Sequence, residues 1–373
     1  MKVIHIFWGL TYGGIETMLV NIVNEQVKLN LEVSLMVINN SVELELQNRI
    51  RKEVHLIKID RKRGTYCLSF IKRINEALVT LKPDIIHLHR SEIRDFINSN
   101  ILNTVRVVST VHDIPSGRLG YPFRWARIIE KSLGMNPGNV CALDKIDHVF
   151  SISKTVADNL LNRYGIKSNI VYNGILSSNF LPRNNELPGK VFRIAQVSRL
   201  EHYKKGQDLL IEAIYLLKTV YGLDVSLTFI GEGTSRLYLQ NLVKQKNLAD
   251  QVTFLGAQSQ TYLENHLKDY DLFIQPSRVE GFGLTVAEAM TANVPVLITD
   301  DQGPAEITEG SRYGWLFKNG DYKSLASEIS RIINNYQEAI KKSNLGKIYV
   351  KNKFDVSVTA KMYVKKYMEI INV

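Results

Sequence analysis

The sequence predicts an α/β fold with two domains, each built around a parallel sheet. The chain has 373 residues, which exceeds what one hydrophobic core usually organises, since domains typically hold about 100 to 200 residues. Short runs rich in Val and Ile alternate with stretches of helical period in both halves of the chain, a pattern typical of repeated βαβ units. We therefore expect two Rossmann-like domains that face a cleft, because ligands bind where parallel strands end.

The first half predicts five strands and four helices. Each strand is a short run of mostly apolar, often β-branched side chains, and each helix has apolar residues three or four positions apart. The expected strands are residues 2–7, 32–38, 84–88, 106–110 and 148–152. The helices are expected to follow Gly14, Tyr66, Glu92 and Lys154.

The second half repeats the alternation. Its apolar runs have the same length and composition as those of the first half, so the same βαβ organisation is expected. The expected strands are residues 192–197, 225–230, 252–255, 271–274 and 295–298. The helices are expected to follow Gly206, Thr234 and Gly283.

A polar segment separates the two halves. Residues 173–174 and 181–190 combine turn residues with few apolar side chains, so we expect the linker there. The N-terminal domain is then 1–175 and the C-terminal domain 176–355. A long, basic helical stretch occupies most of 356–373, and its pattern alone assigns it to neither domain.

The composition excludes several classes of protein. Hydrophobic residues make up 45% and charged residues 23% of the chain, so we expect it to fold throughout. The apolar run near the N-terminus is far shorter than the roughly 18 residues of a membrane span, so neither a span nor a secretory signal is expected. Cys67 and Cys141 lack metal-binding spacing, which favours a reduced, cytoplasmic location over a disulfide framework.

The positive charge is concentrated in the first half. Residues 1–175 contain 23 Lys and Arg against 16 Asp and Glu, and segment 49–73 is especially basic. This segment either attracts a polyanion or an anionic membrane surface, or is an ordinary solvated face. Residues 121–129 interleave aromatic and basic side chains, as a helix at the inner face of a membrane does, or form a buried helix. No recognition pattern for nucleic acid accompanies the charge, so no such partner is expected.

Three loops that follow predicted strands carry candidate binding residues, and the first contains Gly13 and Gly14. Glycine has no Cβ and a helix start offers N–H groups, so the amides there either approach a phosphate or form an ordinary tight turn. The loop lacks the G-x-G-x-x-G spacing of a dinucleotide site. That absence argues against a nicotinamide-dependent oxidoreductase.

The second loop, residues 197–208, is cationic. Arg199 and Lys205 lie between a predicted strand and the helix expected after Gly206. A helix N-terminus already favours anions, and the two cations strengthen that preference. The alternative is a solvated basic turn.

The third loop, residues 276–289, carries two carboxylates around a Gly-Phe-Gly turn. Glu280 precedes the expected helix, whereas Glu288 lies more than one turn inside it. We expect the two to reach different parts of an extended ligand, such as sugar and ribose hydroxyls, while loop amides meet phosphate. The alternative is a helix-dipole glutamate beside a solvated one. A metal site is less expected, because no His or Asp accompanies the pair.

Together these motifs resemble those of glycosyltransferase family 4. The glycine pair, the Arg-Leu and Lys-Gly loop, Glu-Gly-Phe-Gly-Leu with a later Glu, and Gly-Pro-Ala-Glu-Ile at 303–307 occur in this order along essentially the whole chain. The resemblance implies the GT-B fold and a retaining transfer of a hexosyl residue from a UDP-sugar or GDP-sugar to a saccharide or lipid-linked acceptor, with no metal or other cofactor. It also implies that the N-terminal domain binds the acceptor, with the last helix packed back on it, and that the C-terminal domain binds the donor. The expected cellular role is bacterial cell-surface polysaccharide synthesis.

Residue roles follow from the same resemblance. Arg199 and Lys205 are expected to hold the diphosphate, Glu288 the ribose and Glu280 the transferred sugar. His112 resembles the family's histidine near the donor sugar, with a structural imidazole as the alternative. Further donor contacts are expected from Gly14 and from the amides near Phe282, Gly283 and Leu284.

Three questions stay open. The spacing before the Lys-Gly pair is one residue longer than the family's, so either Lys204 or Lys205 is the phosphate ligand, and adjacency to Gly206 favours Lys205. The acceptor hydroxyl approaches near His87, His89 and Arg90, or the two histidines are strand-end packing residues. A GT-B epimerase and a non-catalytic polyanion-binding protein are the alternative functions.

Overall fold

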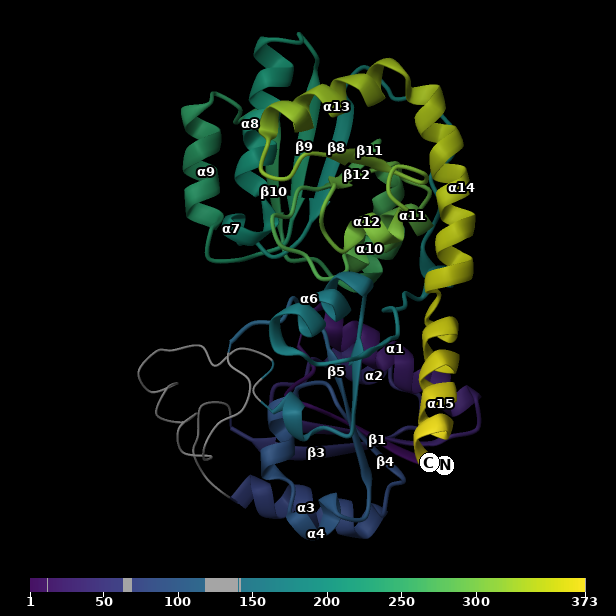
Figure 1. Ribbon diagram of the computed structural model, residues 1–373. Helices are drawn as coiled ribbons and strands as arrows, with labels where there is room; N and C mark the ends of the chain where they lie inside the picture. The colour runs from purple at the N-terminus through teal and green to yellow at the C-terminus, as the bar shows by residue number, and fades with distance from the viewer. Residues whose placement is uncertain (12, 63–68, 118–139, 141, 373) are drawn as a thin grey trace. The chain divides into compact units, whose positions relative to one another are not determined.

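The computed structural model describes residues 1–11, 13–62, 69–117, 140 and 142–372 (Figure 1). The chain forms two compact units. One consists of Met1–Gly174 together with Val356–Val373, and the other of Ile175–Asp355.

The first unit contains a seven-stranded parallel sheet in the order β3-β2-β1-β4-β5-β6-β7. In this order the chain starts at the centre, proceeds to one edge and then returns to build the other, so the switch point lies between β1 and β4. The central strands are mostly apolar because both faces of the sheet are covered, and the histidines that they carry, His5 and His87, are buried as well. The strands are β1 (Lys2–Phe7), β2 (Glu32–Asn39), β3 (His55–Arg61), β4 (Ile85–Leu88), β5 (Arg106–Val111), β6 (His148–Ser151) and β7 (Asn169–Ile170).

Helices pack on this sheet through their apolar faces. Phe70 and Ile74 of the third helix, for example, share a buried cluster with Ile4 and Ile86 of the central strands. The α-helices of the unit are α1 (Gly14–Lys28), α2 (Leu44–Asn48), α3 (Ser69–Leu81), α4 (Ser99–Leu102), α6 (Lys154–Tyr164) and α15 (Val356–Ile371), and its 3₁₀ helices are η1 (Ser91–Phe96) and η2 (Leu143–Lys145).

The second unit contains a six-stranded parallel sheet in the order β10-β9-β8-β11-β12-β13. Its switch point lies between β8 and β11, so the loops that follow these two strands meet at one edge of the sheet. The strands are β8 (Phe192–Val197), β9 (Val225–Ile230), β10 (Val252–Gly256), β11 (Leu272–Gln275), β12 (Val296–Thr299) and β13 (Trp315–Phe317). Both sheets confirm the predicted α/β class with two Rossmann-like parts.

The helices of the second unit follow the same plan, with α8 and α13 packed together on one side of the sheet (Figure 1). They are α7 (His202–Lys205), α8 (Gln207–Thr219), α9 (Arg236–Gln245), α10 (Gln260–His266), α11 (Leu284–Thr291), α12 (Pro304–Ile307), α13 (Tyr322–Asn334) and α14 (Tyr336–Phe354), with 3₁₀ helices η3 (Ser177–Asn179) and η4 (Leu267–Asp269).

Three strands were not expected from the sequence. β3 and β7 lie at or near the edges of the first sheet, and β13 is the edge of the second. An edge strand tolerates polar side chains because one side of it faces solvent. The charged residues of β3 therefore do not give the apolar pattern from which a strand is predicted. β7 has two residues and β13 three, too few to show a period.

The predicted linker is only partly correct. The boundary between the units falls at Gly174, but residues 181–190 belong to the second unit. Arg183 is buried there and forms an ion pair with the fully buried Asp271, at 2.7 Å. The amide of Leu181 donates to the carbonyl of Glu264 at 2.9 Å. The segment is polar because its charge neutralises a buried carboxylate, since a buried charge requires a partner.

The final helix belongs to the first unit. α15 packs along α1, and its residues Tyr363 and Tyr367 are fully buried. The Thr359 hydroxyl donates to the carbonyl of Tyr172 at 2.9 Å. A side chain at the position of Gly174 would collide with Thr359 and the backbone of Val356, so the glycine allows the helix to approach.

Candidate active site

The loop between β8 and α8 depends on a glycine. Gly206 has a φ of +67°, and a Cβ there would collide with the carbonyl oxygen of Pro276 in the loop after β11. Only glycine adopts this backbone conformation without steric cost. The close contact holds the two switch-point loops together, and α8 begins directly afterwards at Gln207.

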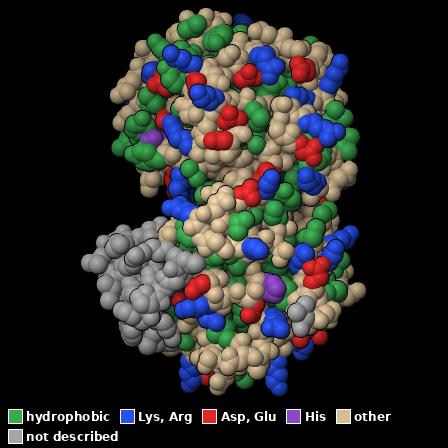
Figure 2. Space-filling view, in the orientation of Figure 1, with side chains coloured by type: hydrophobic (Ala, Val, Ile, Leu, Met, Phe, Trp, Pro, Cys, Tyr) green, Lys and Arg blue, Asp and Glu red, His purple; other side chains and the backbone are tan. Residues whose placement is uncertain are grey.

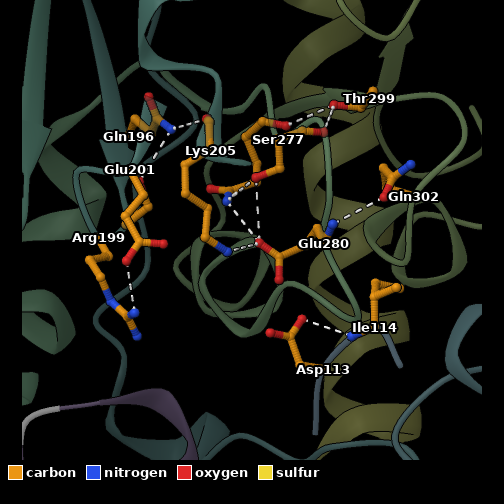
Figure 3. Close-up of polar contacts among 12 residues, drawn as sticks. Asp113, Ile114, Gln196, Arg199, Glu201, Lys205, Ser277, Glu280, Thr299 and Gln302 are labelled. Atoms are coloured by element: carbon orange, nitrogen blue, oxygen red, sulfur yellow. Dashed lines mark hydrogen bonds and ion pairs between the residues drawn. The ribbon is translucent and has the colours of Figure 1, made fainter. Parts of the chain in front are cut away.

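The two loops also share an ion pair. Nζ of Lys205 lies 2.7 Å from Oε2 of Glu280, and the side chains are 22% and 15% exposed (Figure 3). The same carboxylate oxygen accepts from Nε2 of Gln275 at 3.2 Å and from the Ser277 hydroxyl at 3.4 Å. Since Gln275 and Ser277 are buried, Glu280 is held in place independently of the lysine.

The neighbouring cations differ from Lys205 in their surroundings. The Lys204 side chain is exposed, while its backbone oxygen accepts from the amide of Arg278 at 2.8 Å. The Arg199 side chain is 71% exposed and pairs with Glu201 at 2.9 Å. The Gln207 side chain donates to the carbonyl of Arg199, so that backbone is fixed while the guanidinium remains accessible to a ligand.

Arg278 was not singled out from the sequence, although it lies two residues before Glu280. Its guanidinium makes two hydrogen bonds of 2.8 Å to the Asp208 carboxylate and one of 2.7 Å to the carbonyl of His202. The bond to Asp208 raises the pKa of Arg278. A bidentate pair of this kind orients both partners, so Arg278 braces α7 and the start of α8. Its place within the Pro-Ser-Arg-Val-Glu run was the available signal.

The turn that opens α11 contains Gly283, with a φ of +96°. A Cβ there would lie 2.8 Å from Cγ of Pro304. The Gln302 side chain accepts from the amide of Glu280 at 3.0 Å (Figure 3). The Phe282 ring is buried against Phe354, with the ring centroids 5.6 Å apart. The prediction for this turn, which runs on to Leu284, concerns backbone amides, and the Phe282 side chain packs into the core.

Glu288 lies on α11 rather than on the loop. It is only 8% exposed, and its Oε1 accepts from Nε2 of Gln260 at 2.9 Å. Glu280, by contrast, lies beside a cation. The two predicted carboxylates therefore occupy different environments, as expected from their spacing.

The first unit carries the remaining predicted donor contact. Gly14 is exposed at the start of α1, and Gly13 is the N-cap. The Glu16 carboxylate lies close to Gly13 and accepts from the Thr11 hydroxyl at 3.2 Å. An acidic side chain in the first turn complements the helix dipole, and a phosphate placed at this glycine pair would have to share the site with that charge.

His112 follows β5 directly. Its Nε2 lies 2.9 Å from Nδ1 of His89. Burial, together with the smaller effect of the nearby Arg90, lowers the pKa of His112 to about 3. The imidazole is therefore neutral at physiological pH, which suits a hydrogen-bonding role rather than an ionic one.

Three more histidines lie beside it, on β1 and at the end of β4. His5, His87 and His89 are buried, and burial lowers the pKa of each, that of His5 to about 4. One nitrogen from each lies within 4.8 Å of the others. His87 is enclosed by hydrogen bonds of 2.5 Å to the Tyr367 hydroxyl and 2.7 Å to Thr110. Its surroundings match the packing interpretation of the strand-end histidines.

The basic segment 49–73 is described except for residues 63–68. Several of its cations have individual partners: Arg61 stacks on Trp8 and Phe70, and Arg51 pairs with Glu53. Figure 2 shows Lys and Arg interspersed with Asp and Glu on the face drawn. In the described part of the chain, no helix combines the length and apolarity that crossing a bilayer requires. Residues 121–129, predicted to contact a membrane, lie outside the described residues.

A groove of about 450 Å³ lies elsewhere on the second unit. Phe192, at the amino end of β8, and Asp224, just before β9, line it together with the loop between α13 and α14. Ligands of doubly wound sheets bind at the opposite, carboxyl edge. The groove is therefore separate from the loops that carry Lys205 and Glu280.

Comparison with known families assigns both halves of the chain. Residues 12–177 match the model described as Glycosyltransferase Family 4, and residues 177–348 match Glycosyl transferases group 1. An uncharacterized glycosyltransferase from Methanocaldococcus jannaschii is 26% identical over 74% of this chain and 73% of its own. The amylovoran biosynthesis glycosyltransferase of Erwinia amylovora is 30% identical over 44% of this chain, an alignment that spans 42% of that protein.

Solved structures share the fold. The Anabaena protein HepE, crystallised in complex with UDP and glucose, superposes with a TM-score of 0.78 over 99% of this chain and 100% of its own, at 17% identity. At this identity the match is one of fold, and the fold is the two-part GT-B arrangement.

Proposed function

The chain belongs to glycosyltransferase family 4, and we propose that it moves a hexosyl residue from a nucleotide-diphosphate sugar to a hydroxyl of an acceptor, with retention of configuration. The observation that carries this proposal is the contact of Lys205 with Glu280 at the switch point of the second sheet, 2.7 Å between Nζ and Oε2. A cation and a carboxylate held there supply one group for phosphate and one for sugar hydroxyls.

The cations stabilise the leaving group. When the bond between the sugar and the diphosphate breaks, negative charge grows on the phosphate oxygens, and preorganised donors lower the free energy of that state. Lys205 reaches the phosphate by exchanging its carboxylate partner for a phosphate oxygen. Arg199, whose side chain is 71% exposed on the same loop, supplies the second positive charge. No metal ion is required in this scheme.

Glu280 orients the sugar. Its hydrogen bonds to Gln275 and Ser277 keep the carboxylate in place after Lys205 turns toward phosphate. The backbone amides at the start of α11, from Phe282 to Leu284, are further donors to the sugar and phosphate. Hydrogen bonds to an ionised acceptor contribute about 1.5 to 3 kcal/mol each, so one carboxylate discriminates among hydroxyl configurations.

Glu288 binds the ribose of the donor. A vicinal diol donates two hydrogen bonds to one carboxylate, and the low exposure of Glu288 strengthens such bonds by excluding water. The hydrogen bond from Nε2 of Gln260 uses one lone pair of Oε1 and orients the Glu288 carboxylate. The two glutamates thus divide the donor between its sugar and its nucleoside.

The donor, acceptor and cellular role are proposed from relatives. UDP-sugars are the favoured donors, supported by the UDP and glucose bound to the Anabaena structure, with GDP-sugars as the alternative. A saccharide or lipid-linked acceptor in cell-surface polysaccharide assembly is supported by the relative named for amylovoran biosynthesis. The basic first half is consistent with a cytoplasmic protein that visits the inner face of the membrane.

The test is a panel of UDP-sugars and GDP-sugars with the purified protein. Release of free nucleoside diphosphate without acceptor identifies the donor, and NMR of the transferred product shows whether the anomeric configuration is retained. Activity should survive EDTA. Conversion of the donor sugar to its epimer, without transfer to an acceptor, would instead identify an epimerase. Inversion at the anomeric carbon of the transferred sugar would contradict the retaining mechanism.

A further inference from the structure

A chain of hydrogen bonds joins a glutamine of α1 to His112. Oε1 of Gln26 lies 2.7 Å from Nε2 of His5, Nδ1 of His5 lies 2.9 Å from Nε2 of His89, and Nδ1 of His89 lies 2.9 Å from Nε2 of His112. The strands β1, β4 and β5, which carry the histidines or end just before them, are neighbours in the sheet. The chain therefore runs across the centre of the first unit.

The ring geometry suits hydrogen bonds from ring to ring. The planes of His5 and His89 differ by 20°, and those of His89 and His112 by 27°. The ring centroids lie 5.2 and 5.1 Å apart while the bonded nitrogens lie 2.9 Å apart, so the rings meet edge to edge. An N–H of one ring then points at the lone pair of the next, since both lie in the ring plane. Each bond in the chain therefore needs one protonated and one unprotonated nitrogen.

Gln26 determines the direction of this chain. A neutral imidazole has one N–H and one lone pair, and burial keeps the histidines neutral by lowering each pKa. The amide oxygen of Gln26 accepts only, so Nε2 of His5 is the protonated nitrogen and Nδ1 the acceptor. By the same reasoning His89 donates from Nε2 and accepts at Nδ1, and His112 donates from Nε2.

Nδ1 of His112 is then a lone pair. It is buried, and none of the residues that the structure describes forms a hydrogen bond with it. A buried acceptor without a partner costs about 1 to 3 kcal/mol, a cost that a donor group from a ligand removes. If Gln26 presented its NH₂ group to His5 instead, every tautomer in the chain would reverse and Nδ1 would become a donor.

The hydrogen bond to His5 orients the Gln26 side chain, with Oε1 2.7 Å from Nε2 of the imidazole. Nε2 of Gln26 is buried, and none of the described residues forms a hydrogen bond with it. The C-terminal helix contacts the neighbouring histidine, since the Tyr367 hydroxyl lies 2.5 Å from Nδ1 of His87.

We propose that Gln26, His5 and His89 are positioning residues that hold His112 in the Nε2–H tautomer, so that its Nδ1 accepts a hydrogen bond from a hydroxyl of the bound sugar. The choice of hydroxyl as ligand rests on the proposed function, whereas the tautomer of the ligand-free protein does not.

Two nearly isosteric variants test the relay. Gln26→Glu keeps an acceptor toward His5 and preserves the direction of the chain. Gln26→Met removes the acceptor, so the tautomers are no longer constrained. Thr110→Val is the matched control, because it breaks the buried bond from Nε2 of His87 at 2.7 Å without touching the chain. Thermal melts establish that each variant folds.

The direct readout is the ¹⁵N spectrum of histidine-labelled protein without ligand. In wild type, Gln26→Glu and Thr110→Val, His112 should show a protonated Nε2 and an unprotonated Nδ1. In Gln26→Met the signal should shift toward a mixture of tautomers, and kcat/KM for the donor should fall about 3-fold to 10-fold, as loss of one neutral hydrogen bond predicts. A protonated Nδ1 in wild type, or an unchanged tautomer in Gln26→Met, overturns the proposal.

A metal ion is the competing explanation for the histidines. A cation held by His5, His87 and His89 would need an unprotonated nitrogen from each of them. The series of hydrogen bonds instead places protons on some of these nitrogens, in particular on Nε2 of His89. Elemental analysis of the purified protein should find no stoichiometric divalent cation. A bound cation whose removal by EDTA changes the histidine ¹⁵N signals also overturns the relay. If the tautomer is as proposed but no transferase activity is found, only the proposed function fails.

Discussion

The two lysines after β8 illustrate how much one residue of register decides. Lys205 and Lys204 are adjacent in sequence, yet one ammonium lies 2.7 Å from Glu280 and the other side chain is exposed. The turn of α7 separates them, because successive residues of a helix point about 100° apart. The position nearer Gly206 is the one directed at the switch point.

Substitution of each lysine should separate them functionally. Lys205→Ala should lower turnover by about 10² or more, as loss of a donor to developing charge does, whereas Lys204→Ala should change it little. The measurement is the initial transfer rate at saturating donor, with thermal melts as the folding control. If Lys204→Ala loses activity and Lys205→Ala does not, then Lys204 is the phosphate ligand.

The two glutamates should respond to different ligands. Glu288→Gln should weaken binding of the free nucleoside diphosphate by about 1 to 3 kcal/mol, because a charged hydrogen-bond acceptor is lost. Glu280→Gln should leave that binding nearly unchanged and lower turnover, because free nucleotide carries no sugar. Calorimetry with nucleotide and rate measurements decide, and equal losses of affinity in both variants would contradict the division.

At the scale of elements, glycine controls how closely the switch-point loops approach. Gly206→Ala should lower the free energy of unfolding by about 2 to 5 kcal/mol, since it combines an unfavourable φ with a backbone collision. Gly222→Ala is the matched control, because Gly222 has a φ of +63° but open space around it, and should cost only about 1 to 2 kcal/mol. Denaturant titration measures both, and equal losses would rule out the collision.

The buried histidines should make the protein sensitive to acid. The pKa of His5 is lowered to about 4 and that of His112 to about 3, and burial lowers those of His87 and His89 well below the usual value. In the unfolded chain they titrate near pH 6.5. Below that pH the unfolded state binds more protons, so the free energy of unfolding falls as pH falls, by up to about 1.4 kcal/mol per pH unit for each histidine.

Urea denaturation at about pH 7.5 and about pH 5.5 tests this dependence. Replacement of buried His87 by Gln should make the dependence shallower, whereas His148→Asn should not, because His148 is exposed. Full stability is expected above about pH 6.5. A free energy of unfolding that does not change between the two conditions would contradict neutral burial of these side chains.

On the scale of the whole molecule, the chain leaves the first unit at Gly174 and returns to it at Val356. α15 fills the space along α1 with two buried tyrosines, so the first unit is incomplete until the last helix has been made. Deletion of residues 356–373 should therefore destabilise the first unit selectively. Calorimetry should show the unfolding transition of the second unit preserved, and deletion of 372–373 is the control. Loss of both transitions would mean that the units do not fold separately.

Sequence patterns alone predict the α/β class, the central strands, most of the major helices and the loops that carry the candidate site. These features are local: central strands of a parallel sheet are apolar on both faces, and glycines and charges mark the loops where helices begin. The same signals fail at edges. The charged side chains of β3 break the apolar pattern that would predict a strand. Segment 181–190 has the composition of a linker, although the ion pair of Arg183 with Asp271 holds it on the second unit.

The folded structure was needed to show which distant residues share an environment. Gln26, His5 and His89 lie in separate parts of the sequence, and their connection to His112 arises because three neighbouring strands and α1 converge at one place. Tyr367 forms a hydrogen bond with His87, although the two residues lie 280 positions apart in the sequence. Burial and hydrogen-bond partners are properties of packing, and sequence spacing carries no information about them until the fold brings the strands side by side.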